Sequence, residues 1–351
     1  MRRMKAFALP GLIAGLALST AAAAFPIKAG QGTYQDPGIT DDTIKIGLFA
    51  PLSGPARAYG EDPLNAARMW YEMINEMGGI WGRKIELVIE DDRCTANDLV
   101  AAVKKLVEQD QVFMLNGGSC SAAAVAAQEY VLRNKVPYVM LNASGDGALY
   151  PPTDYIFGGI SISQRAVGGI AVDFVVKHFN AKKIGYINHD DAYGAWNLET
   201  AEYMAKEHGV SLSVESINPN ITDVTAPMLK IRAANPDVLI LTTYARPAAL
   251  ILKRAHELGF KGPIVLTVTG TANLKQLVEN VGTKDAFANF YVQDVINDSP
   301  DGPKQRWIID MYKKRYPDLA AKPDHPTPYM PYGVASAQTV THALMLAGPN
   351  P

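Results

Sequence analysis

The stretch NGGSCSAAA, residues 116–124, decides the fold class. It follows an apolar run at 112–115 and leads into an alanine-rich segment at 122–127, and alanine is the strongest helix former. A buried strand that turns over small residues directly into a helix is the repeating unit of an α/β sheet. The N–H groups at such a helix start lack partners and carry a partial positive charge, so they suit an anionic oxygen. Ser121 therefore has two interpretations, a hydroxyl donor to a ligand carboxylate or a cap of the helix.

Strand and helix patterns alternate on both sides of this stretch. Apolar runs bounded by polar or glycine residues predict strands, and apolar spacings of three and four predict helices. In the first half, strands are expected at 44–50, 85–90, 112–115 and 137–141, with helices at 63–77, 96–109 and 122–134. A second series has helices at 166–179, 196–207, 226–234 and 247–258, and strands at 184–188, 212–217, 238–242 and 264–268. Strands that are apolar on both faces and separated by helices predict parallel sheets covered on both sides.

The two series predict an α/β protein with two doubly wound, Rossmann-like lobes joined by a hinge. The extended run ANFYVQDVIND leads the chain back to the first lobe, where helices at 305–316 and 332–346 would dock, separated by the proline-rich and non-helical KPDHPTPYMP. Structured crossings suggest a hinge rather than a loose tether. The expected boundaries are 43–158 plus 294–351 for lobe I and 163–290 for lobe II, with crossings near 155–163 and 288–298.

The first 24 residues have the layout of a cleaved secretory signal, with three cations, an apolar run and a small-residue end. That run is too short to span a bilayer of about 30 Å, and no later window reaches about 18 apolar residues, so direct membrane insertion is not expected. The whole chain has 33 Lys and Arg against 35 Asp and Glu, and removal of the signal takes away only cations. A mildly acidic surface without a basic run argues against a nucleic-acid partner.

Two cysteines, Cys94 and Cys120, remain after the signal. In an exported protein such a pair usually forms a disulfide, and closing a loop of about 25 residues contributes roughly 3 to 4 kcal/mol on the chain-entropy model. Two free thiols are the alternative. A metal site is disfavoured because zinc needs further His or Cys ligands at a suitable spacing.

Catalysis at residues 117–121 is not supported by the local motif. A nucleophile elbow needs Gly-x-Ser-x-Gly, and here the fifth residue is serine, followed by alanines. No phosphate-binding loop is present either, and none of the six histidines lies in a motif that marks it as a base. Ligand capture is the remaining interpretation, because ligands of open α/β sheets bind at the carboxyl ends of strands. Further strand-end loops are VMLNASGDG, APLSGPARAYG, NHDDAYG and TTYARP.

Five segments together resemble the type I periplasmic solute-binding proteins of the branched-chain amino acid ABC transporter family. They are IKIGLFAPLSGPARAYG, NEMGGIWGRKIELVIEDDRC, GGSCS, HDDAYG and LKRAHELGF, and the likeness runs from about residue 44 to 346. It implies a monomeric, periplasmic, non-enzymatic protein that closes its hinge over one small solute and delivers it to a membrane permease. It also implies a disulfide between the two cysteines, with no cofactor and no metal. Since the family continues past residue 346, a third crossing and a final helix are expected to be missing from this chain.

The resemblance also implies a set of ligand-binding residues. They are Tyr59, Ser121, Ala143, Ser144, Tyr193 and Tyr244, together with Thr269. Thr269 stands where amino-acid-binding members usually carry an acid for the α-ammonium group. A buried ammonium without a carboxylate is costly, so an ordinary amino acid is disfavoured. Asp190 and Asp191 either supply that acid from the second lobe or cap the following helix.

An aromatic or phenylpropanoid carboxylate is therefore the first ligand hypothesis. A small dicarboxylate or an amide-type solute is the second, and a branched-chain amino acid is the third. Arg57, Arg165 and Arg246 lie near the predicted loops and either pair with a second anionic group or face solvent. A ligand-binding sensor domain and an exported hydrolase are the alternatives from other functional classes.

Overall fold

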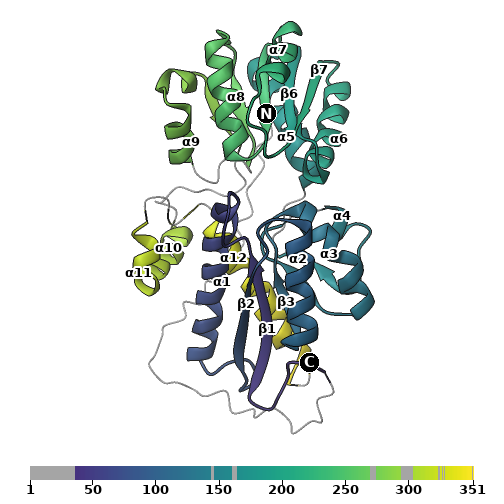
Figure 1. The fold of residues 1–351 in the computed structure, drawn as a ribbon, viewed down its shortest axis with the longest axis vertical. Coiled ribbons are helices and arrows are strands. Elements are labelled where there is room, and N and C mark those ends of the chain that lie inside the picture. Colours follow the sequence, from purple (N-terminus) through teal and green to yellow (C-terminus); the bar gives the residue numbers. More distant parts are fainter. Residues whose placement is uncertain are drawn as a thin grey trace, which may run out of the picture.

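The computed structural model places two α/β lobes one above the other (Figure 1). It describes residues 36–143, 146–159, 164–268, 274–293, 303–322, 325, 327, 329–349 and 351. The predicted signal segment lies outside the described residues. Each lobe is built around one five-stranded parallel sheet, so the predicted fold class is confirmed.

The sheet of lobe I has the strand order β2-β1-β3-β4-β5. Its strands are β1 (Thr43–Ala50), β2 (Lys84–Asp91), β3 (Met114–Gly117), β4 (Tyr138–Met140) and β5 (Ile156–Phe157). The chain moves from β1 outward to β2 and then returns to place β3 on the other side of β1. The order therefore reverses between β1 and β3, and such a switch point opens a crevice at the carboxyl ends of the two strands.

Helices cover both faces of this sheet, as the apolar strands predicted. One face carries α1 (Arg57–Glu76) and α12 (Met330–Ala347). The other carries α2 (Ala96–Lys104), which continues as a π-helical turn at Lys105–Gln109, and α3 (Ser121–Asn134). The short helix α4 (Asp146–Leu149) follows β4, while α10 (Pro303–Arg315) and α11 (Pro317–Ala320) lie beside α1 (Figure 1).

The first helix begins six residues before the predicted start at residue 63 and carries Pro63 inside it. Proline lacks the N–H that would bond the carbonyl four residues earlier, which belongs to Tyr59. That carbonyl instead accepts a hydrogen bond from Asn142 Nδ2 at 2.9 Å. The helix is therefore continuous through the proline, and its freed carbonyl ties Tyr59 to the loop after β4.

Lobe II repeats the same topology, with the strand order β10-β9-β8-β6-β7. Its strands are β6 (Lys183–His189), β7 (Ser211–Ile217), β8 (Val238–Thr242), β9 (Ile264–Leu266) and β10 (Phe290–Val292). Helices α5 (Gln164–Phe179) and α6 (Ala192–Glu207) cover one face. The other face carries α7 (Thr225–Ala233), α8 (Ala245–Glu257) and α9 (Leu274–Val281). The switch point of this sheet lies between β6 and β8.

Three elements between residues 274 and 292 were not predicted from the sequence. They are α9, a 3₁₀ helix at Lys284–Phe287 and β10, which pairs with β9 in parallel. Residues 290–292 therefore belong to the second sheet. The predicted lobe boundaries and the two hinge crossings stay predictions, because each crossing lies partly outside the described residues.

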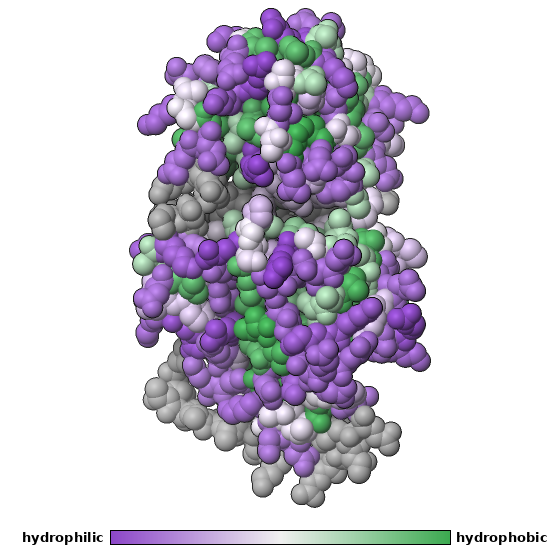
Figure 2. All heavy atoms as spheres, in the orientation of Figure 1, coloured by the Kyte–Doolittle hydropathy of each residue, from purple (hydrophilic) through white to green (hydrophobic). Residues whose placement is uncertain are grey.

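The predicted disulfide between Cys94 and Cys120 is confirmed, with the two Cα atoms 5.4 Å apart. It ties the loop after β2 to the residue that precedes α3. Figure 2 shows hydrophilic residues over much of the visible face of both lobes, with apolar patches among them. None of the helices in the described part of the chain is both long and apolar enough to cross a membrane.

Candidate functional site

The two switch points face each other across the boundary between the lobes. Tyr59 and Ser121 lie in the first turns of α1 and α3, which follow β1 and β3, whereas His189 ends β6 and Tyr244 follows β8 as the N-cap of α8. Contacts between Tyr59 and Tyr244 join the two lobes directly. The candidate site therefore lies at the carboxyl ends of β1, β3, β6 and β8, the strands on either side of the two switch points. Ligands of open α/β sheets bind at this position.

Tyr59 and Tyr244 form the centre of this contact. Their ring centroids are 5.2 Å apart with an interplanar angle of 45°. The Tyr59 hydroxyl accepts a hydrogen bond from the backbone N–H of Ala245, at the start of α8, over 3.3 Å. A tyrosine of lobe I therefore satisfies one of the unpaired amides at a helix start of lobe II. Burial raises the pKa of both phenols, so both stay neutral donors and acceptors.

His189 supports Tyr244 from the end of β6. Its ring is buried and lies edge-on to the Tyr244 ring, with centroids 4.4 Å apart. His189 Nε2 accepts the Tyr244 backbone N–H over 3.2 Å, which places the ring hydrogen on Nδ1. Burial lowers the pKa of His189 to about 4, although the charge of Asp190 opposes this shift. The imidazole is therefore neutral near pH 7 and carries a buried donor, Nδ1, without a hydrogen-bond partner.

Tyr193 adds a third ring from the first turn of α6. It is buried, and its centroid lies 6.0 Å from that of Tyr244 and 5.6 Å from that of His189. Asp191 caps this helix, because its side chain accepts the Gly194 N–H at 3.0 Å. Asp190 is exposed. The prediction that this acidic pair caps the following helix is confirmed for Asp191.

Two further tyrosines, Tyr329 and Tyr332, were missed by the sequence analysis. With Tyr59 they form a buried cluster against which Tyr244 packs. The Tyr329 ring lies 5.5 Å from the rings of both Tyr59 and Tyr332. Its hydroxyl donates to the Val268 carbonyl of lobe II over 2.7 Å. They come from the end of the proline-rich segment and the start of α12, far along the chain from the first loop, so no local pattern marks them.

The NGGSCS turn has the predicted place between β3 and α3. Gly118 has a φ of +78°, and a Cβ there would lie 2.6 Å from the Tyr138 hydroxyl, so glycine is required. Ser121 is the first residue of α3 and does not cap it, since Cys120 occupies the N-cap without a side-chain bond. Ser121 is a buried residue with 7% of its surface exposed, and its hydroxyl makes no hydrogen bond within the described part of the chain. The Ser119 hydroxyl oxygen, by contrast, is itself buried and without a hydrogen-bond partner.

The loop after β4 connects this turn to the tyrosines. Asn142 and Ala143 both donate their N–H groups to the Gly118 carbonyl, at 3.3 and 3.1 Å, while Asn142 also bonds the Tyr59 carbonyl. The Ala143 amide is therefore occupied by the Gly118 carbonyl, and the predicted backbone contact of Ala143 to a ligand stays a prediction. Ser144 and Thr269 lie outside the described residues.

The cationic side chains near the predicted loops do not join the tyrosines. Arg57 pairs with Glu61 at 2.6 Å, and Arg246 is exposed at the start of α8. The Arg165 side chain lies outside the described part. Asp191 Oδ2 lies 3.8 Å from His189 Nδ1, and the Asp191 side chain is occupied as a helix cap.

The site is suited to binding rather than to bond cleavage. Aromatic rings from both lobes, a neutral imidazole and the starts of two helices offer faces for a ring and donors for an anion. The described residues contain no group of three or more His, Cys, Asp or Glu side chains arranged to hold a metal ion. The histidine in the cluster accepts a backbone N–H and is not placed as the base of a serine nucleophile.

Comparison with known proteins gives a consistent set of relatives. The family model described as periplasmic binding protein matches residues 43–351. "Leu/Ile/Val-binding protein homolog 7" of Brucella abortus (strain 2308) is 27% identical over 285 residues, covering 78% of this chain and 71% of that protein.

Solved structures have the same architecture. The substrate-binding protein LivJ of a branched-chain amino acid transporter from Streptococcus pneumoniae, in complex with isoleucine, is 25% identical with a TM-score of 0.73, covering 86% of this chain and 84% of that one. A solute-binding protein from R. palustris, in complex with 4-hydroxybenzoate, has a TM-score of 0.77 and covers 88% of this chain and 82% of its own. At 20% identity, the second likeness shows the fold alone.

Proposed function

This chain belongs to the periplasmic binding protein family, and we propose that it captures a small aromatic carboxylate between its lobes. It is a solute-binding protein of an ABC transporter, not an enzyme. Three further points are proposals beyond family membership: the ligand class, the ligand-binding residues and the removal of residues 1–24 on export. Closure of the lobes would exclude water and present the closed surface to a membrane permease.

The tyrosine cluster that spans both lobes is the observation that carries the ligand class. Tyr59, Tyr329 and Tyr332 from lobe I pack with Tyr244 of lobe II, and Tyr193 stacks on Tyr244. Aromatic faces favour a planar ring through offset and edge contacts. The turn before α3 and the Ser121 hydroxyl would hold the carboxylate, since helix starts favour anions.

The second candidate is a branched-chain amino acid, and two observations favour it. The relatives named above include proteins that bind leucine, isoleucine or valine by name. Asp191 lies close enough to the cluster to raise the pKa of Tyr244, so an acid is within reach of an ammonium group. We rank it second because the Asp191 carboxylate already accepts the amide that starts α6.

A thermal-shift screen of the chain without residues 1–24 tests this ranking. A ligand at 100 times its dissociation constant stabilises the folded state by about 2.7 kcal/mol, so it raises the melting temperature. We expect 4-hydroxybenzoate and 4-hydroxycinnamate to raise it and L-leucine, L-isoleucine and succinate to leave it unchanged. Stabilisation by leucine or isoleucine with no response to ring acids would replace the first hypothesis with the second.

Matched tyrosine variants then locate the binding. Tyr244→Leu removes a ring from the cluster and should weaken binding of the stabilising ligand about fivefold, in line with about 1 kcal/mol for an aromatic pair beyond its buried area. Tyr203, also on lobe II, is exposed on α6, so Tyr203→Leu is the control and should bind like the parent. Equal affinities in both variants would place the ligand elsewhere.

A further inference from the structure

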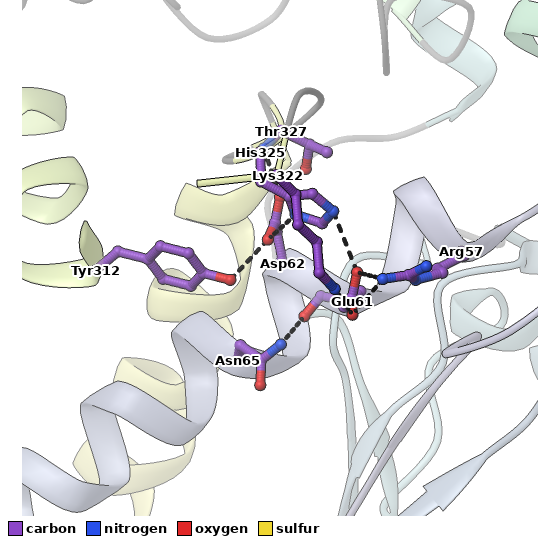
Figure 3. Close-up of polar contacts among 8 residues, drawn as sticks. All are labelled: Arg57, Glu61, Asp62, Asn65, Tyr312, Lys322, His325 and Thr327. Atoms are coloured by element: carbon purple, nitrogen blue, oxygen red, sulfur yellow. Dashed lines mark hydrogen bonds and ion pairs between the residues drawn. The ribbon is translucent and has the colours of Figure 1, made fainter. Parts of the chain in front are cut away.

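A buried carboxylate, Asp62, lies on α1 one helical turn after Tyr59 and has no exposed surface. It accepts three hydrogen bonds (Figure 3): from the Tyr312 hydroxyl at 2.6 Å, from His325 Nδ1 at 2.7 Å and from the Thr327 backbone N–H at 2.5 Å. One side chain therefore joins α1, α10 and the segment that precedes α12. Each donor compensates part of the cost of burying the charge.

Glu61 extends this network beside Asp62. Its carboxylate lies 2.6 Å from Arg57 Nη2, 3.2 Å from Lys322 Nζ and 3.2 Å from His325 Nε2 (Figure 3). The two ring nitrogens of His325 thus face two different carboxylates. The Nδ1 contact with Asp62 is a hydrogen bond, whereas Glu61 Oε2 is buried without a hydrogen-bond partner, so the Nε2 contact is a close approach within ion-pair distance only. Arg57 and Lys322 balance the second negative charge.

The segment that this network holds leads directly to Tyr329. Thr327 and His325 are bonded to Asp62, and Tyr329, two residues beyond Thr327, reaches the Val268 carbonyl of lobe II. Tyr59, on the other side, receives the Ala245 amide of lobe II. Tyr59 and Tyr329, two lobe I tyrosines that contact lobe II, are therefore linked to each other through one carboxylate.

We propose that Asp62 and His325 are positioning residues of the binding site, which hold Tyr329 against Tyr59. Neither side chain belongs to the tyrosine cluster, so they act through Thr327, whose N–H is bonded to Asp62 two residues before Tyr329. We call the hydrogen bonds of Asp62 to His325 and Thr327 the anchor. Loss of the anchor would let Tyr329 move relative to Tyr59, on the lobe I side of the site. The effect on affinity rests on the proposed function, whereas the effect on the Tyr329 segment does not.

Three substitutions of His325 separate its hydrogen bond to Asp62 from its close contact with Glu61. Asparagine places an amide donor near the position of Nδ1 and keeps the bond to Asp62, whereas glutamine places it near Nε2 and keeps only the contact with Glu61. Alanine removes both. His325→Asn should therefore preserve the anchor, while His325→Gln and His325→Ala should release it.

A remote His–Asp pair provides the control. His208 Nε2 lies 2.8 Å from Asp173 Oδ1 on lobe II and is partly buried, like His325. His208→Ala removes a comparable charged hydrogen bond without touching α1 or the segment before α12. It reports what the loss of such a bond does to the whole molecule.

Amide hydrogen exchange on the ligand-free chain without residues 1–24 reads the anchor directly. A hydrogen bond to a charged group restrains local opening, so we expect about 10- to 100-fold faster exchange at the amides of Thr327, Tyr329 and Met330 in His325→Ala and His325→Gln. His325→Asn should stay within about threefold of the parent, and His208→Ala should leave this segment unchanged. Parent-like exchange in His325→Ala, or the same rise in His208→Ala, would overturn the proposal.

Affinity for 4-hydroxybenzoate gives the second readout, by titration calorimetry. It should fall about tenfold in His325→Ala and much less in His325→Asn, because only the first variant releases Tyr329. In a Tyr329→Phe background, His325→Ala should cost less affinity than it does alone, since the two changes then act on one contact. Equal costs in both backgrounds would contradict a positioning role. Absence of 4-hydroxybenzoate binding in the parent would instead refute the ligand assignment, and the exchange data would still decide on the anchor.

Discussion

Replacement of Asp92 by asparagine should make the protein less stable in acid and more stable above neutral pH. Asp92 follows β2 and is fully buried. Its Oδ1 accepts the Cys94 N–H at 2.9 Å, while Oδ2 has no hydrogen-bond partner. Burial raises the pKa of this carboxyl from 3.8 to about 7, and the charges of Asp91 and Asp98 act in the same direction.

The magnitude follows from proton linkage. Because the pKa of Asp92 is higher in the folded state, the folded protein binds this proton more tightly than the unfolded chain does. Its contribution to stability is complete below about pH 4 and is lost as the pH rises to about 7. A pKa difference of about three between the folded and unfolded states corresponds to roughly 4 kcal/mol of folding free energy, at about 1.36 kcal/mol for each unit of pKa.

His189 changes the free energy of unfolding with pH in the opposite direction. Its pKa is lowered from 6.5 to about 4, so its contribution is complete above pH 6.5 and is lost as the pH falls toward 4. That loss amounts to about 3 kcal/mol. The two groups largely cancel in the parent between pH 4 and pH 7, and Asp92→Asn leaves the His189 slope uncompensated.

Urea unfolding at pH 4, 5, 6, 7 and 8, with the disulfide intact, measures the effect. The asparagine amide would lack a partner and costs about 1 to 3 kcal/mol at every pH. The free energy of unfolding of Asp92→Asn minus that of the parent should therefore be negative at pH 4 and rise by about 4 kcal/mol by pH 8. Asp318→Asn, on the exposed start of α11, is the control and should show no such rise. A difference that varies by less than about 1 kcal/mol over this range would refute the reasoning.

Three other changes should have measurable effects. Replacing both Cys94 and Cys120 by alanine should lower the free energy of unfolding by about 3 to 4 kcal/mol in urea, and a loss under about 1 kcal/mol would contradict the loop-closure argument. Tyr59→Phe removes the acceptor of the Ala245 amide, so calorimetry should show ligand affinity about fivefold weaker at an unchanged melting temperature; parent-like affinity would show that this bond is irrelevant. Asn116→Ala breaks buried bonds to Tyr71, Ser336 and the Val139 carbonyl and should cost about 2 to 4 kcal/mol in urea unfolding, whereas a cost under about 1 kcal/mol would mean that these groups find other partners.

The candidate site was only partly accessible to sequence reasoning. Tyr59, Tyr193 and Tyr244 each follow a strand at or near the start of a helix, so a local pattern and a family resemblance pointed to them, and the structure brings all three together. Ala143 was named from the same logic, but its amide is used by the Gly118 carbonyl. That bond depends on how two neighbouring loops pack, which neither loop shows by itself.

The chain's own pattern determined the two parallel sheets, most of the helices between them and the cysteine pair, because burial on both faces and helical spacing are local properties of the sequence. The tertiary structure decided which residues meet. Asn142 bonds the carbonyl that Pro63 leaves free, and Tyr329 reaches Tyr59 across about 270 positions, which no periodicity records. Strand order and lobe closure bring such distant loops to one edge, so the wall of the site and its anchor at Asp62 exist only in the folded chain.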